Sequence, residues 1–103
     1  MSIREHMTRV AAALSLPEIL HDWQGLDTVW PIVERLSEEG GVFVLKLDGE
    51  RSASDAEPRF TVLVSGTHLA RPFRCDSNSL EHAIASVLAD YAADQWGVPL
   101  PCG

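Results

Sequence analysis

Apolar and polar residues follow one another in this chain with two periods, one typical of helices and one typical of strands. Apolar residues recur every three or four positions in residues 3–14, in residues 27–39 and after residue 79. That spacing places them on one face of an α-helix. After residue 41 the period changes to two, which is typical of strands with one buried face. The pattern predicts helices at both ends of the chain and strands between them.

The clearest helix is expected after the polar segment Asp76-Ser77-Asn78-Ser79. Its apolar stripe consists of Leu80, Ala83, Ile84, Val87, Leu88, Tyr91 and Ala92. The polar segment has the composition of a helix N-cap, and Asn78 and Glu81 have the spacing of a capping box. We therefore interpret its serines as capping residues rather than as nucleophiles.

A second helix is expected over residues 27–39. Asp27 suits its N-cap, and Pro31 would lie in its first turn, where the missing N–H costs little. Gly40-Gly41 would end it, since glycine accepts the left-handed backbone conformation that often follows a helix. The apolar stripe of this helix assigns Trp30 to the core.

The N-terminal part predicts two shorter helices. Residues 3–14 have helical spacing of apolar side chains. Pro17 favours the start of a second short helix over residues 17–23, because proline is well suited to a first helical turn.

Three strands are expected in the middle of the chain. In residues 42–48 Phe43, Leu45 and Leu47 would face inward, and in residues 59–65 Phe60, Val62 and Val64 would do so. Residues 49–58 read as a polar loop. The third strand, residues 69–75, contains Pro72, which lacks the N–H needed inside a sheet and so indicates an edge strand or a bulge.

Short connections between consecutive strands favour an antiparallel meander. The expected fold class is α+β: a three-stranded antiparallel sheet packed in two layers against amphipathic helices, in the order α-α-β-β-β-α, where the N-terminal helical extension is counted as one element. We expect residues 1–103 to form one small domain. Residues 1–25 would be a helical extension of this domain, and residues 98–103 a mobile tail.

The chain is acidic, with a net charge of −7 over its 103 residues. Residues 15–45 carry one Arg against six Asp and Glu, and residues 76–103 carry four Asp and Glu without any Lys or Arg. Such a surface repels nucleic acid, so no nucleic-acid partner is expected. No apolar run is long enough to cross a bilayer, and no signal-peptide pattern is present, which favours a cytoplasmic protein without a membrane partner.

Candidate chemistry is sparse. The four histidines are scattered, no Cys-x-x-Cys is present, and no glycine-rich phosphate loop is present, so we expect no metal, no cofactor and no catalytic residue. Cys75 reads as a small apolar residue at a strand end. His68, Arg71 and Arg74 lie close together in sequence and could hold an anion, although charges on an edge strand also serve to prevent strand pairing.

Trp23 and Trp96 lie where helices are expected to end. Aromatic residues at such positions either close the rim of the core or form a contact patch for a partner or a second copy. They are the candidate interaction residues.

The layout from residue 27 to residue 91 resembles the small phage "ABA sandwich" domain of prophage-encoded proteins. The resemblance covers about two thirds of the chain. The matching residues are Asp27-Thr28-Val29-Trp30, Val33-Glu34-Arg35-Leu36, Gly40-Gly41, Asp76-Ser77 and Leu80. The loop at residues 49–58 and the N-terminal helical extension depart from that family, which offers no catalytic residues to transfer. It implies a prophage-encoded accessory protein.

The element order is also similar to that of double-stranded RNA-binding domains, but those use lysines at the start of the last helix, and residues 76–79 contain none. We expect a non-enzymatic domain that binds a protein or associates with itself. Two alternatives remain open: a ligand-binding or enzymatic domain with the anion site described above, and an acidic mimic of nucleic acid.

Overall fold

The computed structural model describes residues 1–48 and 59–101, so the loop expected at residues 49–58 lies outside the described part. Its elements are α1 (His6–Ala13), α2 (Gly25–Glu38), β1 (Val42–Leu47), β2 (Phe60–Ser65), β3 (Phe73–Ser77) and α3 (Leu80–Gln95). The expected α+β class and the order α-α-β-β-β-α are confirmed.

The sheet is an antiparallel meander in the order β1-β2-β3. Its register places Phe43 beside Val64 and Leu45 beside Val62. Directly opposed residues of an antiparallel pair point to the same face. Because Val62 and Val64 are fully buried, this face is the one that packs on the helices, as the alternation predicted.

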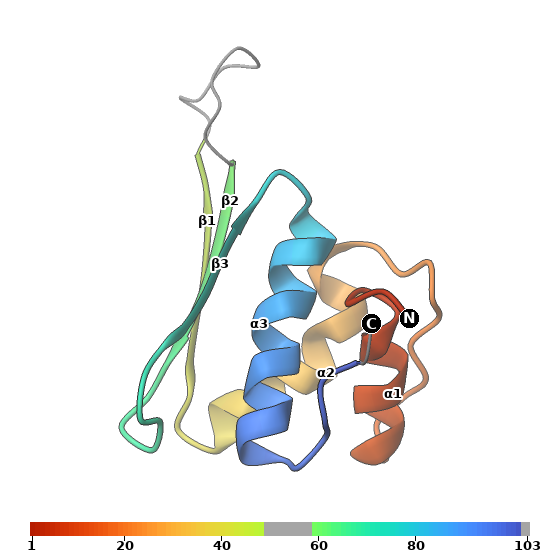
Figure 1. Cartoon of the computed structure of the whole chain (residues 1–103), viewed down its shortest axis with the longest axis horizontal. Coiled ribbons are helices and arrows are strands. Elements are labelled where there is room, and N and C mark those ends of the chain that lie inside the picture. Colours follow the sequence, from red (N-terminus) through yellow and green to blue (C-terminus); the bar gives the residue numbers. More distant parts are fainter. Residues whose placement is uncertain (49–58, 102–103) are drawn as a thin grey trace.

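Two helices cover that face, and a third lies behind them (Figure 1). Helix α3 packs on β2 and β3, and α2 packs on β1 and on α3. Helix α1 packs on α3, on the side away from the sheet. None of the helices in the described part of the chain lies on the opposite face of the sheet (Figure 1).

Helix α3 is the centre of the core. It is buried on most sides rather than on one face, because the sheet, α1 and α2 surround it. Its buried residues are Ala83, Ile84, Ala85, Val87, Leu88, Ala89, Tyr91 and Ala92. The alanine side chains are small, so the neighbouring elements can pack close to the backbone of α3.

Side chains of α3 also hold both ends of α2. The backbone N–H of Gly25 donates to Glu81 Oε2 at 3.1 Å. At the other end, the phenol of Tyr91 donates to Glu39 Oε1 at 2.9 Å. Glu81 therefore satisfies a free N–H at the start of α2, which no side chain of α2 itself does.

Several helix boundaries differ from the expectation. Helix α2 begins at Gly25, so Asp27 lies in its first turn and is not its N-cap. Pro31 consequently lies inside the helix. The N-cap of α3 is Ser79, whose hydroxyl accepts from the His82 N–H at 3.2 Å. The capping-box interpretation of Asn78 is wrong, since its amide oxygen accepts from the Arg59 N–H.

The helix expected at residues 17–23 is absent. Side chains from the N-terminal segment bond the backbone there, so these carbonyls need no helical partners. Thr8 donates to the carbonyl of Ile19, and Arg4 donates to the carbonyls of Asp22 and Trp23. These tertiary bonds hold the segment as an irregular connection that ends in a turn at residues 21–22.

Strand β3 begins after Pro72, four residues later than expected, and it lies at an edge of the sheet, as Pro72 indicated. Val98 is buried and packs with the core, so the segment expected as a mobile tail is anchored at its first residue. The last two residues of that tail lie outside the described part.

His6 is fully buried, and neither of its ring nitrogens has a hydrogen-bond partner within residues 1–48 and 59–101. Burial lowers the pKa of the imidazole from 6.5, and the charge of Arg9 lowers it further. The unfolded chain therefore binds a proton more readily than the folded chain. Stability must decline as the pH falls below about 6.5 towards the folded pKa.

We expect His6→Leu to remove this part of the pH dependence. It should also raise the free energy of unfolding by about 1–3 kcal/mol, the usual cost of burying an unpaired polar group. Urea unfolding at pH 7.5 and 5.5 measures both effects, with His82→Leu, an exposed position, as the control. Parallel pH profiles for the wild type and His6→Leu would contradict this account of His6.

Candidate functional site

The exposed apolar side chains of the described residues are concentrated at β1. Eight large hydrophobic residues are exposed, and four of them lie in this six-residue strand. They are Val42 (53% exposed), Val44 (45%), Leu45 (37%) and Leu47 (61%). A fifth, Trp30, is 45% exposed on α2, the helix that packs on β1. We call these five residues the β1 surface.

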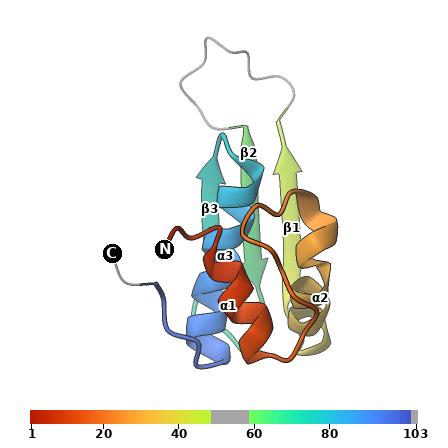
Figure 2. The same ribbon diagram turned by 90° about the vertical axis from the view of Figure 1, so that its right-hand side faces the viewer.

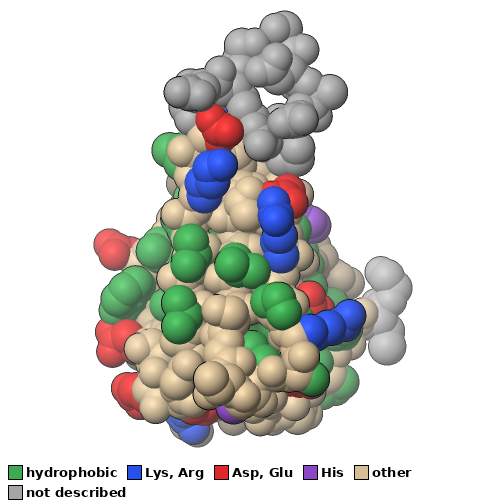
Figure 3. Space-filling model, turned by 90° about the vertical axis from the view of Figure 1, so that its left-hand side faces the viewer, with side chains coloured by type: hydrophobic (Ala, Val, Ile, Leu, Met, Phe, Trp, Pro, Cys, Tyr) green, Lys and Arg blue, Asp and Glu red, His purple; other side chains and the backbone are tan. Residues whose placement is uncertain are grey.

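The β1 surface continues onto the uncovered face of the sheet. Val44 opposes Leu63, and Leu63 opposes Arg74, so all three point to this face. A half-open groove there is lined by Val44, Lys46, Thr61, Leu63 and Arg74. Figure 3 shows the apolar side chains gathered at the centre of this face, with Lys and Arg, and Asp or Glu next to them, around this centre.

The two edges of the sheet differ in chemistry. Pro72 precedes β3, and Arg74 pairs with Asp76 at 3.2 Å on the strand itself. Proline and charged side chains are the usual means by which proteins protect an edge strand from pairing. Strand β1 carries a single charge, that of Lys46, between apolar residues. The β1 edge is therefore the less protected of the two.

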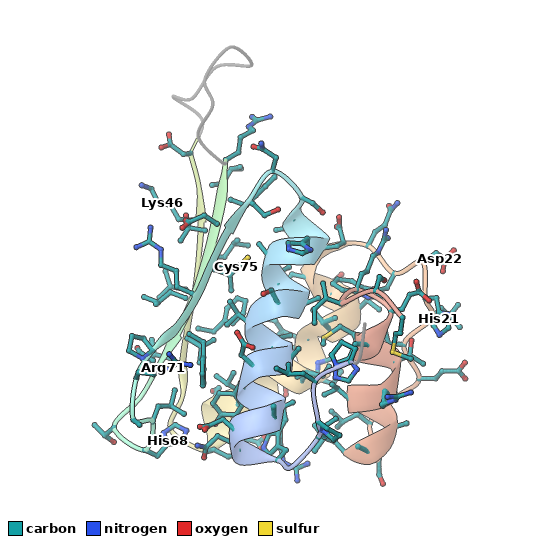
Figure 4. The ribbon with its side chains drawn as sticks, in the orientation of Figure 1. His21, Asp22, Lys46, His68, Arg71 and Cys75 are labelled. Carbon is teal, nitrogen blue, oxygen red and sulfur yellow. The ribbon has the colours of Figure 1, made fainter. Side chains whose placement is uncertain are left out.

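Lys46 points away from the helices (Figure 4). It forms no ion pair with any residue in the described ranges. Its ammonium group lies on the uncovered face, which it shares with Arg74 and with the carboxylate of Asp76. A carboxylate from another molecule would fit beside it.

A polar cluster lies where the C-terminal ends of α2 and α3 meet. The carboxylate of Glu39 accepts the indole N–H of Trp96, at 2.7 Å to Oε2, and the phenol O–H of Tyr91. The Tyr91 oxygen in turn accepts from His68 Nε2, 2.8 Å away, so we assign the Nε2–H form to that ring. Burial raises the pKa of the Tyr91 phenol, and so does its bond to Glu39. This cluster holds a proton on Tyr91 and fastens α2 to α3.

We expect Tyr91→Phe to lower the free energy of unfolding by about 1–3 kcal/mol, because the ring keeps its packing while Glu39 and His68 lose a partner. Chemical denaturation measures this, and Tyr91 is fully buried, so the variant leaves the surface unchanged. Ser86→Ala, a half-buried position of the same helix, serves as the control. An unchanged midpoint would mean that the cluster adds nothing to stability.

The two candidate tryptophans are both engaged inside the molecule. Trp23 is only 4% exposed and donates its indole N–H to the carbonyl of Arg4 at 2.8 Å. Trp96 is half-buried against Tyr91, with ring centroids 4.9 Å apart. Trp30, which the sequence pattern assigned to the core, is the exposed tryptophan; that assignment was wrong.

The candidate anion residues are engaged with different partners. His68 bonds Tyr91, whereas Arg74 pairs with Asp76 on the uncovered face. Arg71 lies near Asp90 of α3, where its charge opposes the rise that burial causes in the pKa of that carboxyl. His68 and Arg71 are near one another at the start of β3 (Figure 4).

Within residues 1–48 and 59–101, no group of three or more His, Cys, Asp or Glu side chains has a metal-binding arrangement. Cys75 is a free, half-buried thiol between the sheet and α3 (Figure 4). None of the helices in these ranges has the length and apolarity to cross a membrane.

The chain matches no family model, no curated protein and no solved structure. The assignment of the β1 surface as a candidate site therefore depends on the geometry of this chain alone. Sequence reasoning missed it because alternation in a strand shows which residues share a face, but not whether the covering helix reaches the end of that strand. The one usable signal was that the other set of β1, Val42 and Val44, is apolar as well.

Proposed function

We propose that this chain is a small non-enzymatic domain that binds another protein through the β1 surface. The observation that carries the proposal is the concentration of exposed apolar side chains on β1 and α2, next to Lys46. Exposed apolar patches of this kind mark contact sites in proteins that are otherwise polar outside. Trp30 adds a residue type that often dominates binding energy.

The alternative of an anion-binding or enzymatic site has less support. Of its three candidate residues, His68 and Arg74 already have partners within the fold. The groove on the uncovered face is half-open to solvent, whereas ligand sites usually enclose most of the ligand.

The mimic of nucleic acid is also disfavoured, because the centre of the uncovered face is apolar (Figure 3) and the groove there is lined by Lys46 and Arg74. Absence of nucleic-acid binding, a cytoplasmic location and a prophage origin of the kind implied by the "ABA sandwich" resemblance remain predictions.

Leu47→Glu tests the proposal, with Leu20→Glu as a matched control. Both leucines are 61% exposed, but Leu20 lies in the segment before α2, away from β1. Each tagged variant is used for quantitative capture from the cells that naturally make the protein. We expect Leu47→Glu to lose at least about 90% of the specifically captured partner, a loss of roughly 1.4 kcal/mol or more in binding.

Leu20→Glu should capture the partner as well as the wild type does. Both variants should unfold at nearly the wild-type denaturant concentration, since both positions are exposed. Equal capture by the two variants would overturn the proposal, because the contact would then lie elsewhere.

A further inference from the structure

We infer that the partner binds as an added β-strand along β1, an inference that rests on the proposed function and specifies how it is carried out. The partner would be an extended segment of another protein. Its residues alternate between apolar side chains on the helix side and side chains that include a carboxylate on the uncovered side. The inference rests on four properties of β1: its backbone, its flanking side chains, its charge and its helix.

The backbone of β1 has a free side. The N–H of Asp48 donates to the carbonyl of Arg59 at 2.9 Å, which fixes the alternation of hydrogen bonds along this pair. Even-numbered residues of β1 therefore bond β2, and Phe43, Leu45 and Leu47 direct their N–H and C=O groups away from the sheet. Among the described strands none lies beyond β1. These three alternate residues thus offer all the backbone donors and acceptors that a new strand needs for pairing with β1.

The side chains beside this ladder are suited to an alternating segment. On the helix side, Leu45 and Leu47 are exposed, and α2, the helix that contains Trp30, runs along β1 at the side of the sheet farthest from β3 (Figure 2). Apolar residues of an added strand would bury these groups. On the uncovered side, the alternate residues of the added strand would lie beside Val44 and Lys46. The ammonium group of Lys46 forms no ion pair with a described residue, so it favours Glu or Asp at the neighbouring position.

A second copy of the chain fits this edge poorly. Neighbouring strands lie about 4.8 Å apart, whereas packed helices need about 8–10 Å between their axes. Helix α2 packs on β1 itself, while α3 packs on β2 and β3. If two copies paired through their β1 strands about a two-fold axis, both α2 helices would lie over the same strand–strand contact. Two acidic chains would also be brought together. A lone extended segment carries no such helix.

The test uses hydrogen exchange of the ¹⁵N-labelled full chain, followed by NMR. The probe is a synthetic eight-residue peptide with Val at alternate positions and Glu and Thr between them. The control peptide contains the same residues in an order without alternation. At saturation with the probe, we expect exchange at the amides of Phe43, Leu45 and Leu47 to slow by about tenfold or more, as new hydrogen bonds form.

The amides of Val44 and Lys46 serve as internal controls, since their bonds to β2 already exist. Leu45→Pro removes one outward N–H at an edge position that tolerates proline, and it should weaken peptide binding about tenfold or more. Lys46→Glu should weaken binding of the probe and favour a peptide with Lys in place of Glu. The exchange measurement on the wild-type chain holds even if Leu45→Pro does not fold.

Unchanged exchange at Phe43, Leu45 and Leu47, or equal slowing by the control peptide, would overturn strand addition. If Leu47→Glu still abolishes capture in that case, the proposed function stands and only its mode is wrong. A concentration-dependent dimer in sedimentation that Leu45→Pro abolishes would also overturn the inference, because the occupant would then be a second copy.

Discussion

Replacing Leu88 by Ala should lower the free energy of unfolding by about 2–5 kcal/mol, the range found when a large buried side chain is truncated in a packed core. Leu88 is fully buried on α3, the helix around which the sheet, α1 and α2 are packed. A cavity there removes contacts on several sides at once. For a domain of this size, such a loss is a large part of the total stability.

Leu20→Ala is the matched control, since it makes the same change at a position that is 61% exposed. It should change stability by less than about 0.5 kcal/mol. Urea denaturation of both variants gives the comparison. Similar losses for the two variants would mean that α3 is not the centre of the core.

Trp23→Ala should cost about 3–5 kcal/mol of stability, as expected for a buried tryptophan. Its ring is 4% exposed, its indole N–H bonds the carbonyl of Arg4, and the Arg4 guanidinium lies 5.8 Å from its ring centroid. Trp23 thus joins the N-terminal segment to the core. Thermal or chemical denaturation measures the loss.

Trp30→Ala is the counterpart of this change. Trp30 is 45% exposed, so its loss should cost about 1 kcal/mol or less in stability, because much less apolar area leaves the core. It should instead reduce capture of the partner. The reverse result, with Trp30 needed for folding and Trp23 for capture, would rule out the β1 surface as the contact site.

The sheet was predictable from the sequence because a period of two residues fixes which side chains share a face. Phe43, Leu45 and Leu47 do share the face of Val62 and Val64. Their burial was not predictable in the same way: Leu47 is 61% exposed, although it points to the covered face. How far a helix extends over a strand depends on tertiary packing, which local periodicity does not encode.

The helix boundaries failed for a related reason. The start of α2 is capped by Glu81, 56 positions later in the chain, so no local signal marks it. The segment 17–23 is kept out of a helix by Thr8 and Arg4, whose side chains donate to its carbonyls in place of helical N–H groups. Trp30 lies at the flank of its stripe, and a stripe does not tell which flank a neighbour covers.

Site-specific photo-crosslinking tests the β1 surface most directly. A benzophenone amino acid is placed at Val44, at Leu47 or at Leu20, all of which are exposed apolar positions, and the protein is irradiated in the cells that make it. The account predicts a covalent adduct with the same partner protein from Val44 and Leu47 and none from Leu20. Adducts from Leu20 alone, or none from either β1 position, would contradict it.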